Sequence, residues 1–465
     1  MVGRPVTSRT TETRTMVSSP PMSAKDSIIA AISLLVFSFL DLLDFSLCYL
    51  YRFLDSVLEE SPVACYCRWG RRTGIFVGEA ESETLRGRRN LFRVRSGFAC
   101  VGEKGYGKEE KGCDARSPRW SDCSCEACLS WQEKAKEELH LVAMDVCGGR
   151  KEEHKFDSFG GSPKVTDNSV ESVVFIHGFL SSSSMWVETV FPNLSQVAKE
   201  SFRMIAVDLL GFGRSPKPTN CMYTLKDHLQ MIEKSVLTPL QLNSYHIVAH
   251  SMGCVIALAL AASSPDSIKS ITLIAPPYFE SSEPEASHTA LNRLAARRVW
   301  PPLLFGSAVM SWYEHIGRTV CFFFCRNHWM WEWIIKLVTR KRELSFLFTD
   351  LTRHTHHSAW HTMHNVICGG AKSMDRYLEA VREAKIPVRV IQGDMDQVVP
   401  LECSYNLKAK LPFAELQVVS GRDHCSVIVG REESLTKELE AIWFSSRTEP
   451  SVRSGSIYPP GGTKP

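Results

Sequence analysis

The sequence of 465 residues has no excess of charge of either sign, since 54 Lys and Arg stand against 51 Asp and Glu. A net charge of +3 gives no basis for binding nucleic acid, so we exclude nucleic acid as the main partner. The chain also has no internal repeat and no aromatic platform for carbohydrate, which argues against a polymer-binding scaffold. Its 44% hydrophobic and 23% charged residues are ordinary for a globular protein. This composition excludes a mainly disordered, collagen-like or multi-span membrane protein.

Long apolar runs are scarce as well, and the run near the N-terminus, residues 28–40, has only 13 residues. A membrane-spanning helix needs about 20 apolar residues, whereas the apolar part of a secretory signal needs roughly 7–15 after a basic segment. Residues 1–27 supply that basic segment. We therefore expect a signal sequence or a signal anchor and entry into the secretory pathway. No clear small-x-small cleavage site follows, and Ser46-Leu47-Cys48 is the nearest one.

Beyond the apolar run, polar residues recur every three or four positions in an otherwise apolar stretch. They are Asp41, Asp44, Cys48, Arg52, Asp55 and Glu59. This spacing predicts a helix with a polar stripe along one side. Such a helix can lie on a membrane surface or dock on the folded body, and the sequence leaves both open.

Cysteine is the residue type in surplus, with 16 in the chain and eight of them between residues 61 and 165. Hydrophobic periodicity fades in this segment, which we expect to be mostly irregular. Cys123-Ser-Cys125-Glu-Ala-Cys128 resembles half of a zinc site, whose fourth ligand Cys113 or Cys147 could supply. Disulfides, unpaired thiols and zinc all remain open for these cysteines.

From residue 172 onward, short β-branched runs alternate with helical patterns. This alternation predicts an α/β fold with a mostly parallel sheet covered by helices on both faces. We expect strands at 173–176, 203–207, 245–249, 270–274, 387–391 and 416–419, and helices at 182–198, 224–237, 252–263, 401–410 and 432–443. The domain prediction is a leader (1–60), a Cys-bearing segment (61–165), a core (166–276 and 373–445), a helical lid (277–372) and a flexible tail (446–465).

The central chemical signal is Ala249-His250-Ser251-Met252-Gly253, between an expected strand and its helix. A sharp strand-to-helix turn exposes one Ser above the sheet edge, in the arrangement called the nucleophile elbow. Small residues are needed two positions before and after that Ser, because strand and helix approach closely there. Gly253 meets this need, and Ala249 departs from the usual Gly by one methyl group. We predict Ser251 as a catalytic nucleophile.

A Ser hydroxyl needs an adjacent base, and the base needs a carboxylate to orient it. Two later strands of the expected sheet end in loops that carry such groups, Asp394-Met395-Asp396 and Asp423-His424. Carboxyl ends of parallel strands meet at one edge of the sheet, so these loops fall beside Ser251. We predict His424 as the base and Asp396 as the acid. Asp394 is the rival acid, whose alternative role is to cap the turn after Gly393.

An oxyanion hole needs two backbone N–H donors, and the expected sources are Met252 and Phe179. Met252 follows the nucleophile, and Phe179 follows the first strand of the domain in His177-Gly178-Phe179. We expect His177 to pack or orient its loop rather than to act as a base. We treat His250 as structural, because neighbours in an elbow point apart. This chemistry requires no cofactor, and we assign no metal to the catalytic site.

With these motifs in view, the chain resembles the α/β-hydrolase superfamily and, within it, the plant bodyguard family of probable lysophospholipases. The likeness rests on Val174 to Phe179, Asp208 to Ser215, Ala249 to Gly253, Gly393 to Asp396 and the His424 loop, in that order. The resemblance implies an α/β-hydrolase fold, a lipid acyl-ester substrate and a role in cuticle (cutin) formation at the epidermal cell wall. It also implies an extracellular or cell-wall location. Besides a lipid or acyl-ester substrate, a membrane surface and a cell-wall polyester are the partners that the sequence leaves open.

The expected lid is rich in aromatic residues and holds five His between residues 354 and 364. The surplus of apolar side chains suggests an acyl-chain pocket, a membrane-facing surface or plain cap packing. His357, His361 and His364 share a helical face, so metal binding is one interpretation. We expect instead that Trp360, His361 and His364 pack the lid or lie near the pocket mouth.

Together these features predict a serine esterase or lipase that forms an acyl-enzyme. The same site could serve as an acyltransferase or polyester synthase if an alcohol replaces water. The His-x-x-x-x-Asp motif of some acyltransferase relatives is absent, because Val429 stands five residues after His424. A third alternative, from a different class, is a non-catalytic lipid or hormone receptor that keeps the triad.

Overall fold

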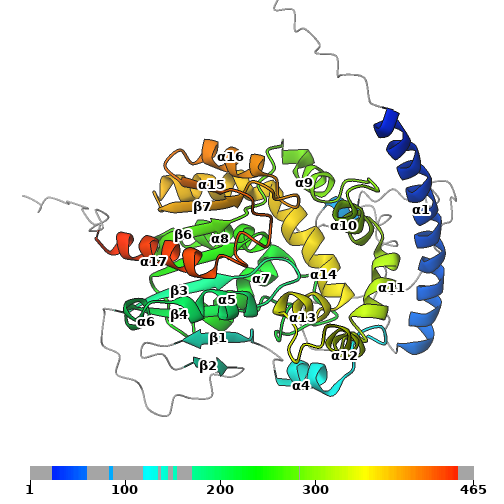
Figure 1. Ribbon diagram of the computed structural model, residues 1–465, viewed down its shortest axis with the longest axis horizontal. Coiled ribbons are helices and arrows are strands. Elements are labelled where there is room, and N and C mark those ends of the chain that lie inside the picture. Colours follow the sequence, from blue (N-terminus) through cyan, green and yellow to red (C-terminus); the bar gives the residue numbers. More distant parts are fainter. Residues whose placement is uncertain are drawn as a thin grey trace, which may run out of the picture.

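The structure, a computed structural model, describes residues 24–59, 83–86, 119–134, 138–144, 150–153, 170–281 and 283–448. It has a central sheet with helices on both faces, a group of helices beside one end of the sheet, and a long N-terminal helix along the outside of that group (Figure 1). The described residues end at 448, so the expected tail (446–465) lies outside them from residue 449 onward.

The sheet has eight strands in the order β2-β1-β4-β3-β5-β6-β7-β8. From β4 to β8 all neighbouring strands are parallel. Alternation along each strand sends neighbouring side chains to opposite faces. Both faces of the sheet centre are covered, so the central strands are mostly apolar, whereas β8 at the edge is partly exposed. The parallel strands are β3 (Glu171–Ile176), β4 (Phe202–Val207), β5 (Tyr245–His250), β6 (Ile268–Ile274), β7 (Val388–Gly393) and β8 (Glu415–Val419).

Two hydrophobic clusters lie on the two faces of the sheet. One contains Val174 and Ile176 with side chains from α7 (Leu225–Ile232), α8 (Met252–Ser263), α15 (Met374–Glu383) and α16 (Leu401–Lys410). The other contains Val173 and Phe175 with side chains from α5 (Ser184–Thr189), α6 (Gln196–Ser201) and α17 (Glu432–Thr448). The predicted α/β-hydrolase arrangement, a mostly parallel sheet between two helical layers, is therefore confirmed.

The sheet extends further toward the N-terminus than expected. β1 (Leu141–Met144) pairs antiparallel with β4 and with β2 (Arg150–Glu153). Both strands lie inside the segment 61–165 that was expected to be mostly irregular. Strands of four residues are too short to show the alternation by which a strand is recognised. The core sheet thus begins before residue 166.

One expected helix is broken. Instead of a helix over 182–198, the structure has α5, a 3₁₀ turn at Phe191–Asn193 and α6. Pro192 lies in that turn, and a proline has no N–H to continue the helical bonding. The expected helix 224–237 is α7 followed by a π-helical segment, Glu233–Leu237. Two short 3₁₀ turns, Pro265–Ser267 and Ala371–Ser373, precede β6 and α15.

The chain between β6 and α15 forms the lid, and it is helical as expected. After a 3₁₀ turn at Glu283–Glu285 its helices are α9 (Ala286–Leu294), α10 (Pro302–Trp312), α11 (Glu314–Phe324), α12 (His328–Thr339), α13 (Phe346–Thr352) and α14 (His356–Thr362). A π-helical segment, Met363–Cys368, continues α14. α14 lies between the sheet domain and α11 (Figure 1).

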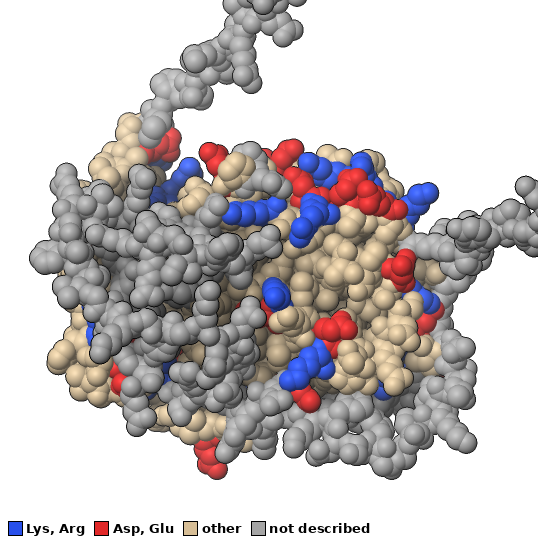
Figure 2. Space-filling model, turned by 180° about the vertical axis from the view of Figure 1, so that it is seen from behind, with Lys and Arg blue, Asp and Glu red and all other residues tan. Residues whose placement is uncertain are grey.

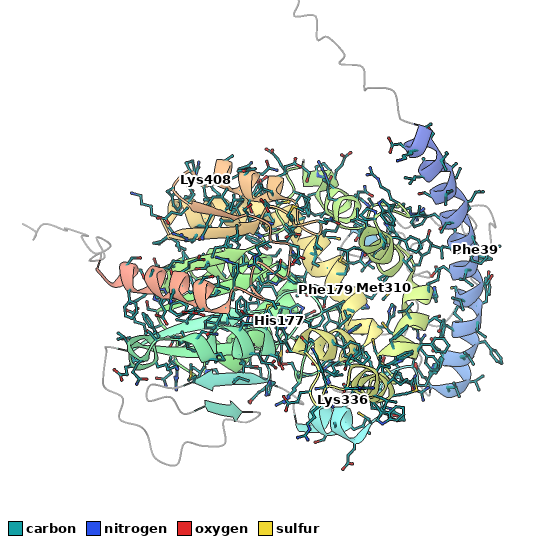
Figure 3. The ribbon with its side chains drawn as sticks, viewed as in Figure 1. Phe39, His177, Phe179, Met310, Lys336 and Lys408 are labelled. Carbon is teal, nitrogen blue, oxygen red and sulfur yellow. The ribbon has the colours of Figure 1, made fainter. Side chains whose placement is uncertain are left out.

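The N-terminal segment contributes one continuous helix, α1 (Ala24–Leu58), which unites the expected apolar run and the expected striped helix. It packs along α11 of the lid. Within the described residues of the Cys-bearing segment lie two further helices, α2 (Glu83–Arg86) and α4 (Glu126–Lys134). The polar stripe of α1 faces the lid, and residues such as Phe39 point away from the body (Figure 3).

Charged side chains of both signs lie close together on one face of the molecule. On the face seen from behind, acidic and basic side chains of the described residues intermix along the edge over α15 and α16 (Figure 2). They do not form a patch of one sign there.

Candidate active site

Ser251 lies at the turn between β5 and α8, and its backbone has the conformation of a nucleophile elbow. Its φ of 52° and ψ of −121° place a non-glycine residue in a strained region. The Ser251 N–H donates to the Ile274 carbonyl at 2.8 Å, which ties the turn to β6. A Cβ at Gly253 would lie 2.7 Å from the His177 carbonyl oxygen. Glycine is therefore required there for α8 to approach the end of β3.

His424 and Asp396 meet at Ser251 from two separate loops. The Ser251 Oγ lies 3.0 Å from His424 Nε2, and His424 Nδ1 lies 2.7 Å from Asp396 Oδ2. This is the connectivity of a nucleophile, a base and an orienting carboxylate. The structure thus brings together the three residues that the sequence singled out for catalysis. Only 8% of Ser251 is exposed, so the nucleophile is buried within the protein.

The Asp396 carboxylate is held by further hydrogen bonds. Its Oδ1 accepts from the N–H groups of Val398 and Val399, both at 2.8 Å, and its Oδ2 accepts from Gln392 Nε2 at 3.1 Å. Ser404 in turn donates to Gln392 Oε1 at 3.0 Å. Gln392 and Ser404 were not found from the sequence, because no motif marks residues that act through a carboxylate.

Asp394, the rival acid, points elsewhere. Its carboxylate accepts from the Gly421 N–H at 2.7 Å and from Ser420 Oγ at 3.1 Å. These bonds tie the β7 loop to the β8 loop and leave Asp396 as the carboxylate beside His424. A Cβ at Gly393 would lie 2.2 Å from the Arg422 carbonyl oxygen, so the two loops also require glycine at this point.

The two predicted oxyanion donors lie on either side of Ser251. Met252 is the first residue of α8, and a helix leaves its first N–H groups without an intrahelical acceptor. Phe179 follows Gly178, whose hypothetical Cβ would lie 3.2 Å from Ser251 Cβ. The loop after β3 therefore passes directly beside the nucleophile. The aromatic ring of Phe179 in this loop packs edge-on against that of Phe212.

His177 and His250 hold this arrangement in place. His177 Nδ1 donates to the Gly178 carbonyl at 2.7 Å, and its Nε2 accepts from the Leu209 N–H at 2.9 Å. Burial lowers the pKa of His177, which keeps the ring neutral. His250 Nε2 donates to the His424 carbonyl at 3.0 Å. Burial, with His424 close by, lowers the pKa of His250 to about 3. Neither ring contacts Ser251 Oγ as a base would.

Asp208 forms a second buried network beside the site, which the sequence did not assign. It accepts from the Ser183 N–H at 2.6 Å, the Arg214 N–H at 2.8 Å and His140 Nδ1 at 2.9 Å. Burial alone would raise the pKa of Asp208, yet the bond from His140 and the other donors hold that pKa well below its ordinary value. A Cβ at Gly213 would lie 2.3 Å from this carboxylate.

The His-rich stretch of the lid is buried and packed rather than open to the site. His364 bonds to Thr84 Oγ1 at 2.9 Å and to the Ser311 carbonyl at 3.0 Å. The His361 ring lies 4.2 Å from that of His357, and burial lowers the pKa of His361 to about 3. The Trp360 ring lies 4.6 Å from that of His364. Among the described residues, His357, His361 and His364 do not form a metal-ligand cluster.

Two other sets of side chains have the composition of metal ligands, and neither includes the triad. One is Cys123, Cys125, Cys128 and His328, and the other is Cys321, Cys325 and His354. None of the eleven described cysteines is part of a disulfide. The other cysteines, including Cys113 and Cys147, lie outside the described residues.

Comparison with known proteins places the chain among hydrolases. A family model described as alpha/beta hydrolase fold matches residues 171–301. The probable lysophospholipase BODYGUARD 4 of Arabidopsis thaliana is 48% identical over 432 residues, which cover 91% of this chain and 99% of that protein. The probable lysophospholipases BODYGUARD 5 and BODYGUARD 1 of the same plant are 44% and 38% identical, over 90% and 92% of this chain and 95% and 98% of their own lengths.

Proposed function

Because the chain belongs to the BODYGUARD family of probable lysophospholipases, which has the α/β-hydrolase fold, we propose that it hydrolyses lipid acyl esters with Ser251 as the nucleophile. The observation that carries this proposal is the continuous hydrogen-bonded path from Ser251 Oγ through His424 to Asp396. The lysophospholipid is the substrate class that the names of the relatives suggest.

In the proposed reaction His424 Nε2 takes the proton of Ser251 as Oγ attacks the acyl carbon. The N–H groups of Met252 and Phe179 stabilise the oxyanion of the tetrahedral intermediate. His424 then gives its proton to the leaving alcohol, and the acyl group remains on Ser251. Water, deprotonated by the same imidazole, releases the fatty acid and restores the serine. Asp396 keeps the ring oriented and stabilises the imidazolium.

Labelling with a fluorophosphonate tests the nucleophile directly. We expect the full-length protein to be labelled on Ser251 and Ser251→Ala to remain unlabelled. Ser263→Ala, at the exposed end of α8, is the matched control and should be labelled like the natural chain. Labelling that persists in Ser251→Ala would contradict the proposal.

A substrate assay separates the three functions that the sequence left open. Release of fatty acid from lysophosphatidylcholine, absent in Ser251→Ala, supports the esterase. Faster transfer to a hydroxy fatty acid than to water would indicate instead the acyltransferase or polyester synthase of cutin formation. Saturable lipid binding without turnover, unchanged in Ser251→Ala, would indicate the receptor.

We also propose that α1 stays attached and lies against a membrane with its apolar side. By length and composition α1 is apolar enough to cross a bilayer. However, its polar stripe is engaged by the lid: Asp44 accepts from the His315 N–H at 2.8 Å, and Asp55 binds Arg318 through two bonds of 2.7 Å. Crossing the membrane would pull these groups away from their partners.

The opposite side of α1 is exposed and apolar. Leu35 is 72% exposed, Phe39 63% and Phe53 65%. An amphipathic helix with such a side lies in the interface of a bilayer. This arrangement agrees with a secretory-pathway protein at the outer surface of a membrane or in the cell wall, close to lipid substrate.

Vesicle co-sedimentation of the full chain tests this placement. Replacing both Leu35 and Phe39 by Glu should lower binding to phosphatidylcholine vesicles by at least about tenfold, because each side chain buried in lipid contributes roughly 1.5–3 kcal/mol. Val197→Glu, at a 61% exposed apolar residue of α6 in the core, is the matched control. Equal binding of both variants, or an intact mass that begins after Cys48, would contradict the placement.

A further inference from the structure

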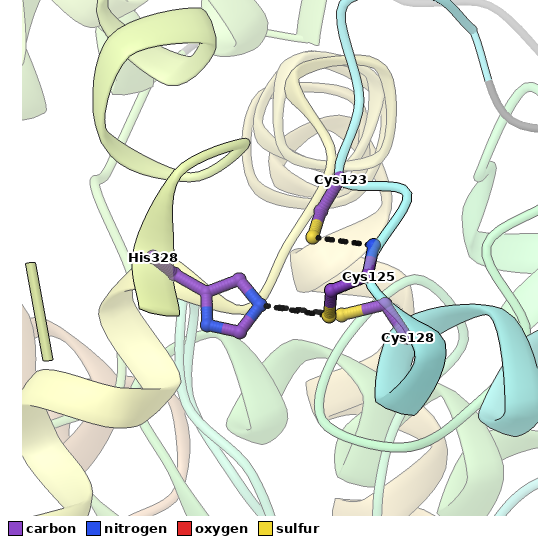
Figure 4. Close-up of side chains that lie close together, drawn as sticks. All are labelled: Cys123, Cys125, Cys128 and His328. Atoms are coloured by element: carbon purple, nitrogen blue, oxygen red, sulfur yellow. Dashed lines mark hydrogen bonds between the residues drawn. The ribbon is translucent and has the colours of Figure 1, made fainter. Parts of the chain in front are cut away.

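Three cysteines of the N-terminal segment and one histidine of the lid converge on a single point. Cys123, Cys125 and Cys128 lie at and just before the start of α4, and His328 is the first residue of α12 (Figure 4). His328 Nε2 lies 3.5 Å from Cys125 Sγ and 3.4 Å from Cys128 Sγ. The four ligand atoms all lie within 4.8 Å of one another. Residues about 200 positions apart thus form one cluster.

The cluster has the dimensions of a zinc site. With Zn–S of about 2.3 Å and Zn–N of about 2.0 Å, a tetrahedral ion holds sulfur and nitrogen ligands about 3.5 Å apart. The two measured sulfur–nitrogen distances agree with that separation. The Cys125 N–H also donates to Cys123 Sγ at 3.4 Å, which stabilises a thiolate at that position. Three cysteines and one histidine are a common ligand set of structural zinc.

The histidine is also oriented as a metal ligand. His328 Nδ1 bonds to Glu332 Oε1 at 3.0 Å, so the proton lies on Nδ1 and Nε2 is left to face the thiols. Arg353 holds the same carboxylate oxygen at 3.1 Å. Zinc-bound histidines usually donate their second N–H to a carboxylate in this way. This carboxylate is an independent observation, since a chance group of thiols would not require it.

We propose that Cys123, Cys125, Cys128 and His328 bind one structural Zn²⁺ that fastens α4 of the N-terminal segment to α12 of the lid. The sequence showed half of this site but not the fourth ligand, because His328 is distant along the chain and Cys113 and Cys147 are nearer. Lys217 and Arg353, which line the hollow beside the cluster, offset the negative charge of three thiolates on one divalent ion.

A second set of ligands adjoins the first, since Cys325 and His328 lie three residues apart at the two ends of the turn between α11 and α12. His354 Nε2 lies 3.6 Å from both Cys321 Sγ and Cys325 Sγ. This set has three ligands within the described residues, whereas structural zinc takes four. The proposal therefore concerns the four-ligand cluster, and the three-ligand set serves as a comparison.

Metal content of the full-length protein, purified from a secretory host and dialysed against a weak chelator, tests the proposal. We expect about one zinc ion per chain, lost in Cys128→Ala and retained in both Cys321→Ala and Cys403→Ala. Cys403 is a buried thiol of α16 outside both sets, so it controls for the loss of a cysteine. Cobalt(II) should replace the ion and give the visible absorption of a tetrahedral thiolate site.

If Cys128→Ala does not fold, the zinc content of His328→Cys and His328→Ala is compared instead. We expect His328→Cys to retain zinc, because a fourth thiolate binds the ion, and His328→Ala to lose it, because a methyl group is no ligand. Glu332→Gln should weaken zinc binding roughly 10–100-fold. A protein without zinc whose Cys123, Cys125 and Cys128 form disulfides would overturn the proposal, as would zinc lost in Cys321→Ala but not in Cys128→Ala. These readouts are independent of ester hydrolysis.

Discussion

The core of the sheet domain is mainly apolar, whereas the region formed by α1 and the lid buries paired charges beside its apolar side chains. In the sheet domain, Val174 and Phe175 point into two apolar clusters, and the polar residues are mostly outside. Between α1 and α11, Asp44, Asp55 and Arg318 are buried, whereas Leu35 and Phe39 are exposed. The outer surface of the sheet domain is therefore suited to contact with water. The outer surface of the second region carries exposed apolar side chains, on which the proposed membrane placement rests.

The energetic terms differ accordingly. Apolar burial, which is not directional, is the main force that packs the helices of the sheet domain onto the sheet. The contact between α1 and the lid combines an apolar cluster around Phe37, Tyr313 and Ile316 with paired charges and hydrogen bonds. Each of the paired polar groups becomes costly if its partner is removed. The following substitutions test this contrast.

The largest effect is expected in the sheet domain, at Asp396. Asp396→Asn should lower kcat by about 10³–10⁴-fold, because the ring of His424 loses the carboxylate that fixes its tautomer. The neighbouring Asp394→Asn should change kcat by less than about tenfold, since Asp394 only ties two loops together. Steady-state ester hydrolysis measures both. A larger loss in Asp394→Asn would reverse the assignment of the acid.

A large effect on stability is expected where α1 meets the lid. Arg318→Met should destabilise this region by about 3–5 kcal/mol, since it leaves the buried Asp55 carboxylate without its charged partner and with only the bond from Trp120 Nε1. Lys437→Ala removes an ion pair to Glu433 whose side chains are 71% and 74% exposed, so it should cost less than about 1 kcal/mol. Chemical unfolding, with limited proteolysis to detect release of α1, distinguishes them. Equal stability of the two variants would mean that apolar packing, not charge, holds α1.

The same contrast explains what the sequence could and could not predict. In the sheet domain, β-branched runs and the residues that follow them predicted β3 to β8 and the loops that carry Ser251, Asp396 and His424. For α1 the spacing of polar residues correctly predicted a stripe, but periodicity cannot say which side is buried. β1 and β2 were missed because four-residue strands carry almost no pattern. Asp208 and His328 were missed because the side chains they bond to are distant in sequence. Gln392 was missed because no motif marks a residue that acts through a carboxylate.

A pH-dependent effect is expected at Asp350, where α13 of the lid meets the sheet domain. Ser182 Oγ donates to its carboxylate at 2.8 Å, and burial raises the pKa of Asp350 to about 7. The folded protein therefore keeps this proton between about pH 4 and pH 7, where the unfolded chain has lost it. The stability that the protonated group contributes is fully present below about pH 4 and is lost as the pH rises through 7.

Asp350→Asn cannot titrate and keeps the acceptor for Ser182. Its melting temperature should match that of the natural protein at about pH 4 and exceed it at pH 8, by a difference equivalent to roughly 4 kcal/mol. Thermal unfolding at the two pH values measures this. If the difference does not grow with pH, another group controls the contact between the lid and the sheet domain.

The smallest effect is expected at Ala249, and it separates the two small residues that flank the nucleophile. A Cβ at Gly253 would lie 2.7 Å from one carbonyl oxygen and 2.8 Å from another, so Gly253→Ala must displace the turn and should abolish most activity. Ala249 already carries a methyl group that is fully buried in an apolar cluster. Ala249→Gly, which restores the common motif, should therefore lower stability by about 1 kcal/mol through lost packing and added chain entropy. Its kcat should not change, because the constraint on spacing lies on the helix side of Ser251; a rise in kcat would show that the methyl group strains the turn.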